Sequence, residues 1–231
     1  MGRQKLRPVD LLRDRRRERI EQVIAGRTRT LTVVLEEVHD PHNHSAVLRT
    51  AECFGIQDVH VVEGPRSPFR AAKLVARGAD KWVDVHRSRD VVAKIRELQG
   101  QGFRVLASRL DAAATPLHAL DPEEKLALVF GNESHGVSPA AIAACDGAFV
   151  VPMYGFTQSL NISVAVAVSL SWLALHRARV RGGSPGDLEA AEAAELRDRF
   201  CFQAVRQRGR IFGRKRPTPE LLAQLREEEE T

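Results

Sequence analysis

Apolar segments of strand length alternate with patterns of helix length through the middle of the chain. Strand-like runs are expected at residues 31–38, 59–62, 82–85, 104–108, 126–130 and 148–151. Helical patterns cover residues 45–54, 71–76, 90–99 and roughly 159–179, with Asn43 as the N-cap of the first and Gly55 as its closing glycine. Because strands and helices alternate, the pattern predicts an α/β fold with a mostly parallel sheet covered by helices.

Two further helical patterns lie outside this core. Residues 11–24 carry an apolar stripe on a basic helix, and a second pattern runs from Leu188 to Val205 after the chain-breaking segment Gly182–Gly186. We therefore expect a basic N-terminal helical extension over residues 1–29, one α/β domain over 30–180 and a basic C-terminal helical extension over 181–231. The apolar stripes of the extensions are expected to pack on the domain rather than to bind a membrane.

The net charge of +5 conceals an uneven distribution along the chain. Residues 1–29 carry a net charge of +6 and residues 197–216 carry +7, whereas residues 30–196 and 217–231 each carry −4. Two basic flanks around a mildly acidic centre favour binding to nucleic acid. Ordinary solvated charged faces are the alternative that charge alone leaves open.

Several classes of protein are disfavoured by what the sequence lacks. The longest apolar run, residues 162–175, is interrupted by three serines, so no membrane span is expected, and no apolar signal core precedes it. Cys53, Cys145 and Cys201 are widely spaced, which suits a reducing cytoplasm better than disulfides or zinc. Nucleotide-binding glycine loops and common hydrolase motifs are missing as well.

A histidine cluster around Asn43 raises the question of a metal site. His39, His42 and His44 are spaced by three and two residues, which fits no helical ligand pair, and acidic ligands are not clustered beside them. We interpret them as turn or surface histidines and expect no metal.

Three loops at strand ends carry the polar residues that suggest chemistry. The first, residues 40–50, offers the amide of Asn43 and the guanidinium of Arg49, a fork suited to phosphate. The second, residues 130–136, places Glu133 between two glycines that permit close approach of the backbone to a ligand. The third, residues 151–163, leads through a glycine turn into a helix start where exposed N–H groups can hold polar ligand atoms. Each loop alone is equally consistent with a helix cap, a tight turn or a surface arginine.

Together, in this order, the loops resemble the three sequence motifs of the SPOUT superfamily of methyltransferases. PHNHSAVLRTAECFG, FGNESHG and VPMYGFTQSLNIS are similar to its motifs 1, 2 and 3, in particular to those of the TrmH-like branch, the tRNA (guanosine-18)-2′-O-methyltransferases. The likeness covers most of the chain, including the basic N-terminal helix, and becomes looser after Gly182.

The resemblance implies a fold and a cofactor that periodicity does not show. It implies a parallel sheet whose C-terminal third threads into a deep trefoil knot, a rare topology, and a homodimer with each active site near the subunit interface. S-adenosyl-L-methionine would sit bent in the knot, held mainly by backbone groups, and would leave as S-adenosyl-L-homocysteine. By position, the cofactor-binding residues would be Ser108, Gly131, Val151, Met153, Gly155 and Leu160.

For the reaction, the resemblance implies methylation of a ribose 2′-hydroxyl in tRNA, at guanosine-18 of the D-loop. A ribose hydroxyl needs alignment and removal of its proton. The resemblance assigns the central role to Arg49, with help from Asn43, Glu133, Ser159 and Asn161. Arg49 is interpreted either as the general base or as a clamp on an RNA phosphate, since a guanidinium pKa above about 12 makes proton loss difficult.

For the basic flanks, the resemblance leads to a specific hypothesis, namely that they bind the tRNA backbone around the D-arm. The candidates are Arg13, Arg15, Arg16, Arg17 and Arg19 at one end and Arg206, Arg208, Arg210, Arg214, Lys215 and Arg216 at the other. One alternative is a relative acting on ribosomal RNA, although about thirty residues before the core leave no room for the separate RNA-binding domain often found there. A non-catalytic RNA-binding protein is disfavoured by the joint presence of Arg49, Glu133, Ser159 and Asn161.

Overall fold

The computed structural model describes residues 12–65, 67–69 and 78–211, with side chains described as far as residue 205. The chain divides into two compact units: residues 26–187 form one, and residues 1–25 together with 188–231 form the other. The expected helix at residues 71–76 lies outside the described residues, as do Arg214, Lys215 and Arg216.

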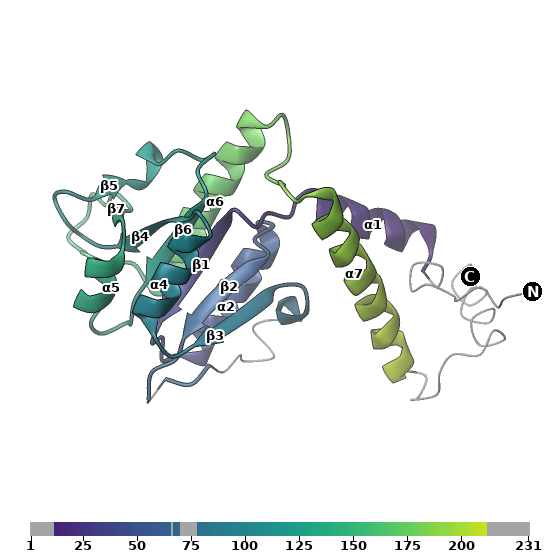
Figure 1. Ribbon diagram of the computed structural model, residues 1–231, viewed down its shortest axis with the longest axis horizontal. Helices are drawn as coiled ribbons and strands as arrows, with labels where there is room; N and C mark the ends of the chain where they lie inside the picture. The colour runs from purple at the N-terminus through teal and green to yellow at the C-terminus, as the bar shows by residue number, and fades with distance from the viewer. Residues whose placement is uncertain (1–11, 66, 70–77, 212–231) are drawn as a thin grey trace, which may run out of the picture. The chain divides into compact units, whose positions relative to one another are not determined.

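The larger unit is built on a seven-stranded sheet in the order β3-β2-β1-β6-β4-β7-β5, in which every neighbouring pair is parallel (Figure 1). The central strands are apolar and buried on both faces, which is typical of parallel sheets. The strands are β1 (Leu31–Glu36), β2 (Asp58–Val62), β3 (Asp84–Ser88), β4 (Arg104–Ser108), β5 (Thr115–Pro116), β6 (Leu126–Phe130) and β7 (Gly147–Val150).

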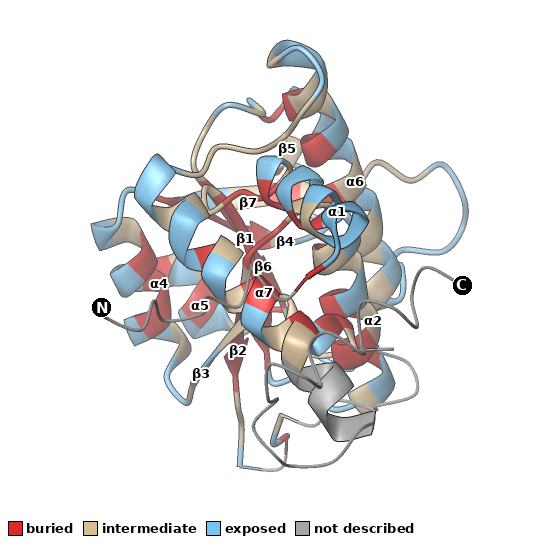
Figure 2. Cartoon of the chain, turned by 90° about the vertical axis from the view of Figure 1, so that its right-hand side faces the viewer, coloured by how far each residue is buried: buried red, intermediate tan, exposed pale blue. Residues whose placement is uncertain are grey.

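Two layers of helices cover the sheet, each over its own buried cluster (Figures 1 and 2). On one face α2 (Pro41–Cys53) and α6 (Ile162–Val180) pack on side chains such as Val33, Val59 and Leu128. On the other face α4 (Val91–Gly100) and α5 (Pro139–Ala144) pack on Val34 and Val129. Short 3-10 helices, η2 (Ala79–Lys81) and η3 (Leu117–Ala119), connect strands. This three-layer arrangement confirms the predicted α/β fold and makes its sheet wholly parallel.

The structure corrects several expected element boundaries. Helix α2 begins at Pro41, so its N-cap is Asp40, whose side chain accepts a hydrogen bond from the His42 N–H, and not Asn43. The strand expected at 82–85 occupies 84–88 instead, and α5 and β5 were not expected. Gly55 does follow the helix end in a left-handed conformation, with φ +76°.

In the described part of the smaller unit, two helices pack on each other, α1 (Asp14–Ala25) and α7 (Ala190–Ile211). Their buried side chains include Ile20 and Ile24 from α1 and Leu196 and Phe200 from α7. An exposed ion pair links them, because Arg197 Nε donates to Glu21 Oε1 at 2.5 Å. The apolar stripes that the sequence pattern indicated pack on each other, where packing on the α/β domain was expected. Arg13, Arg15, Arg16 and Arg19 are exposed.

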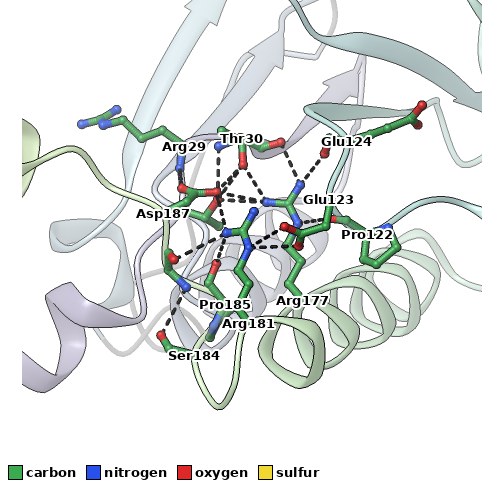
Figure 3. Close-up of polar contacts among 12 residues, drawn as sticks. Arg29, Thr30, Pro122, Glu123, Glu124, Arg177, Arg181, Ser184, Pro185 and Asp187 are labelled. Carbon is green, nitrogen blue, oxygen red and sulfur yellow. Dashed lines mark hydrogen bonds and ion pairs between the residues drawn. The ribbon is translucent and has the colours of Figure 1, made fainter.

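A buried arginine binds the segments that enter β1 and β6, at the amino ends of these strands (Figure 3). The guanidinium of Arg177, near the end of α6, is fully buried and donates to Thr30 Oγ1 at 2.8 Å and to the carbonyl oxygens of Thr30, Pro122 and Glu124. Asp187 faces it at 3.4 Å and also accepts from the Arg29 N–H at 3.1 Å. These partners satisfy a charge whose burial would otherwise be costly, and they join β1, β6 and the C-terminal end of α6.

Candidate active site

The loops that follow β4, β6 and β7 meet around a cavity of about 700 Å³. Ser108, Phe130 and Val150, the last residues of these three strands, all line it. Ligands of open parallel sheets bind outside the carboxyl ends of the strands, and the cavity occupies that place. Its lining mixes apolar side chains with polar groups, among them Leu110, Met153 and Leu160 beside Asn132, Gln158 and Ser159.

The second loop is a tight hairpin whose tip lines the cavity. The backbone groups of Asn132 and Gly136 exchange two hydrogen bonds, at 3.0 and 2.8 Å, and Asn132 Oδ1 accepts from the Ser134 N–H at 2.7 Å. A Cβ on Gly131 would lie 2.0 Å from the Gly136 carbonyl carbon, so only glycine fits there. The hairpin therefore holds Glu133, Ser134 and His135 in a fixed turn at the cavity.

Glu133 joins this hairpin to the start of α2. Its Oε1 accepts from Asn43 Nδ2 at 2.9 Å and from the Asp40 N–H at 3.3 Å, and its Oε2 accepts from the His39 N–H at 3.2 Å. Desolvation alone would raise the pKa of this carboxyl, but the hydrogen bonds, with that of Asn43 the largest, lower it below its usual value. Glu133 is therefore an ionised acceptor that fixes two loops against each other.

Asn132 makes a second link to the first loop. Its Nδ2 donates to the Glu37 carbonyl at 2.8 Å and lies 2.5 Å from His39 Nδ1. The β1–β6 pairing, in which Leu35 is the register partner of Phe130, brings the two loops together. The sequence analysis did not single out Asn132, although an Asn directly after a glycine in a strand-end loop is a turn signal.

The third loop leads from β7 into α6. Asn161 is the N-cap of α6, and its Oδ1 accepts from the Ser163 N–H at 2.8 Å and from Ser163 Oγ at 2.6 Å. Ser159 and Leu160, directly before the cap, line the cavity. Tyr154 and Phe156, in the turn around Gly155, are fully exposed.

The structure brings most of the predicted cofactor residues into one place. The cavity is lined by Ser108, Gly131, Val151, Met153 and Leu160, together with the predicted catalytic residues Glu133 and Ser159. Gly155 and Asn161 flank these residues in sequence and are not part of the lining, and Asn43 reaches the site through Glu133. The lining residues that the sequence did not single out include Arg109 and His135.

Arg49 lies apart from this group in a single chain. It is exposed on α2, and among the residues that the structure describes its side chain makes no hydrogen bond or ion pair. Asn43 is buried on the same helix, six residues earlier, which places the two side chains on different faces. A free guanidinium on an exposed face is suited to bind phosphate.

The predicted RNA-binding residues lie mainly on the smaller unit. Arg13 and Arg16 are exposed, and Arg17 is half-buried, 3.5 Å from Asp14. Arg206, Arg208 and Arg210 lie on α7. In the described part of the chain, no cluster of His, Cys, Asp and Glu is arranged to hold a metal ion. No helix in the described ranges has the length and apolar character to cross a membrane.

Residues 30–171, which contain the sheet and all three loops, match the model of the SpoU rRNA Methylase family, and the chain belongs to this family. The chain is 40% identical to the tRNA (guanosine(18)-2′-O)-methyltransferase of Thermus thermophilus, over 73% of this chain and 85% of that protein. It is 36% identical to the enzyme of the same name from Borreliella burgdorferi, over 84% and 87% of the two chains.

A solved structure has the same fold. The A. aeolicus TrmH/SpoU tRNA modifying enzyme superimposes with a TM-score of 0.75 at 28% identity, covering 83% of this chain and 98% of that one. The resemblance to the TrmH-like enzymes that the three motifs indicated is thereby confirmed.

Proposed function

We propose that this protein methylates the 2′-hydroxyl of a ribose in tRNA, at guanosine-18 of the D-loop, with S-adenosyl-L-methionine as methyl donor. The observation that carries the proposal is the cavity at the carboxyl ends of β4, β6 and β7, lined by motifs 2 and 3 and tied through Glu133 to motif 1. Relatives that align over most of their own length carry this activity in their names.

The cavity suits the proposed donor in size and in chemistry. Its volume of about 700 Å³ lies in the range of small-molecule sites. Leu110, Met153 and Leu160 offer apolar surface for an adenine ring, and the backbone beside Ser108, Gly131 and Val151 offers polar groups for the rest. We extend the binding set to Gly155 in the adjoining turn. S-adenosyl-L-methionine supplies an electrophilic methyl group on a sulfonium centre.

The chain's own residues then bind and orient the RNA. We assign Arg49 to clamp an RNA phosphate, because it is exposed and a guanidinium retains its proton. Asn43 and Glu133 fix the loops, and Ser159 and Asn161 position the ribose at the start of α6. The basic residues of α1, α7 and the segment after α7 hold the tRNA backbone.

We also propose the trefoil knot that the family resemblance implies. The sheet order supports it, because β7 lies between β4 and β5, so the chain returns past an earlier connection after β6. The cavity is lined by this same returning segment.

The active form is proposed to be a homodimer in the cytoplasm. Along α6, Val164, Val168, Trp172 and Leu175 each expose more than a third of their surface and recur at helical spacing, which makes one apolar stripe. Exposed apolar stripes of this kind mark protein interfaces. Sedimentation of the wild-type chain should give a dimer, and Val168→Glu should give a monomer; a wild-type monomer at micromolar concentration would contradict the proposal.

The function is tested by transfer of a labelled methyl group to bulk tRNA and, in parallel, to ribosomal RNA. We expect label in tRNA alone, and nucleotide mapping should place 2′-O-methylguanosine at position 18. Label in ribosomal RNA alone would shift the assignment to that substrate. No transfer to either RNA, with intact cofactor binding, would favour a binding protein.

A further inference from the structure

Three ionisable side chains line the cavity: Arg109, Glu133 and His135. Arg109 pairs with Asp111 at 3.3 Å, and a guanidinium keeps its proton. Glu133 already accepts hydrogen bonds from Asn43 and from two backbone N–H groups, so its lone pairs are directed at the protein. Neither group is suited to take a proton from a ligand in the cavity.

His135 differs from both in chemistry and in surroundings. It is exposed at the tip of the motif 2 hairpin, and imidazole is the side chain that changes protonation near neutral pH. The hairpin that carries it is held by the paired backbone groups of Asn132 and Gly136 and by Asn132 Nδ2, which donates to the Glu37 carbonyl. A proton acceptor on a fixed loop is positioned without the cost of ordering it during reaction.

We propose that His135 is the general base that accepts the proton of the ribose 2′-hydroxyl, an inference that rests on the proposed methyl transfer to RNA. As the oxygen bonds to the methyl carbon, its O–H bond breaks and the proton passes to a ring nitrogen of His135. The bond between the methyl carbon and the sulfonium sulfur breaks with its electron pair going to sulfur, which becomes a neutral thioether. The imidazolium then releases its proton to water.

Proton acceptance and phosphate binding were alternative roles for Arg49, and the proposal gives them to two different residues. Arg49 lies outside the cavity lining and holds phosphate, whereas His135 lies in the lining and handles the proton. The two residues should therefore fail differently when they are replaced: loss of Arg49 reduces RNA binding and its salt dependence together with turnover, whereas loss of His135 slows the chemical step and leaves RNA binding unchanged.

The first test compares His135→Asn and His135→Gln with the control His118→Asn, an exposed histidine on η3. Single-turnover methylation of tRNA is measured with saturating donor from about pH 5.5 to 9, around the titration of imidazole. The wild-type rate should rise with pH and level off. Both His135 variants should lose about 10²- to 10⁴-fold and lose this pH dependence, with partial rescue by free imidazole. The control should match the wild type, and thermal unfolding checks that each variant folds.

A second readout does not depend on activity. The imidazole resonances of His135, assigned by comparison with the variants, are recorded by NMR at fixed pH with and without S-adenosyl-L-methionine. Because His135 lines the cavity, these resonances should shift when the donor binds, whereas those of His118, which is not among the lining residues, should not. S-adenosyl-L-homocysteine, which lacks the methyl group and the positive charge, should shift them less.

The outcomes distinguish the inference from the function beneath it. If the wild type transfers no methyl group to tRNA, the proposed function fails and the inference fails with it. If the wild type is active and His135→Asn keeps the wild-type rate and pH profile, or if the donor leaves the His135 resonances unchanged, the inference alone is overturned.

Discussion

The side-chain amide of Asn43 donates to the carboxylate of Glu133 at 2.9 Å, across 90 residues of sequence. This bond joins the first turn of α2 to the motif 2 hairpin, and the Glu133 carboxylate also accepts from the backbone of His39 and Asp40. Motif 1 and motif 2 therefore form one unit, held together by side-chain hydrogen bonds between segments that are distant in the sequence.

Replacing Glu133 should loosen that unit. In Glu133→Gln the new amide nitrogen faces N–H donors, so we expect a loss of about 1–2 kcal/mol in unfolding free energy and at least about 10-fold in methylation rate. Denaturant unfolding and single-turnover assays measure the two effects. Glu124→Gln, which alters only a surface pair with Arg104, is the matched control. Equal behaviour of the two variants would contradict the anchoring role.

His44 should limit stability at acid pH. It is 1% exposed, neither ring nitrogen has a hydrogen-bond partner, and burial lowers its pKa below 6.5. Because the unfolded chain binds the proton first, stability should fall as the pH drops below about 6.5. His44→Leu should add about 1–3 kcal/mol, most at low pH, since it removes two unsatisfied buried nitrogens. Thermal unfolding at pH 8 and pH 5, around the titration of histidine, measures this; a His44→Leu protein less stable than wild type would refute it.

Gly131 and Gly155 form a matched pair of alanine tests. A Cβ on Gly131 would clash with the Gly136 backbone at 2.0 Å, whereas a Cβ on Gly155 meets nothing within 4 Å. Gly131→Ala should open the hairpin and weaken binding of S-adenosyl-L-methionine at least about 10-fold, a cost typical of displaced backbone. Gly155→Ala should keep near wild-type binding, because the proposed contact of Gly155 with the donor is made by its backbone and the added Cβ meets no neighbouring atom. Calorimetric titration of the donor measures both, and retained affinity in Gly131→Ala would show that the hairpin does not shape the donor site.

Arg49→Ala should abolish turnover while donor binding stays intact. If Arg49 clamps phosphate, tRNA affinity should also become less dependent on salt, by about one phosphate contact. Arg96→Ala, which removes an exposed arginine from α4, is the control. Near-normal turnover in Arg49→Ala with intact donor binding would remove Arg49 from the site.

The exposed arginines of α1, and Arg13 directly before this helix, should contribute to tRNA capture but not to chemistry. Arg13→Gln combined with Arg16→Gln should weaken tRNA binding and reduce its salt slope by up to about two phosphate contacts. The single-turnover rate at saturating tRNA should not change. Deletion of residues 217–231, whose net charge is −4, should leave the slope as it is. An unchanged slope in the double variant would count against this surface.

The sequence pattern predicted those strands whose apolar residues form an unbroken run. β4 and β6 have the expected bounds because both faces of each strand are buried. β5 has two residues and α5 has six, too few for a periodic pattern to stand out. Asp40 replaced Asn43 as the N-cap because Pro41 fits the first helical turn, which lengthens α2 toward its N-terminus.

The site was predicted only in part, for a related reason. The three loops could be recognised from their residues, but the Asn43–Glu133 bond depends on β1 lying beside β6, which local sequence does not specify. The same dependence explains why the sequence did not distinguish His135 from other histidines. Its place in the cavity becomes evident only when the loops after β4, β6 and β7 are brought together.

Helix α6 runs from the carboxyl ends of the strands to their amino ends. Asn161 caps its first turn beside the cavity, and Arg177 fixes its last turn at the amino ends of the strands. At 1.5 Å per residue, Asn161 and Arg177 are roughly 24 Å apart along the helix. The far end of this helix is thus fixed by a buried charge that lies outside the cavity lining. Substitutions in motif 3 should therefore leave the axis of the helix that follows it unchanged.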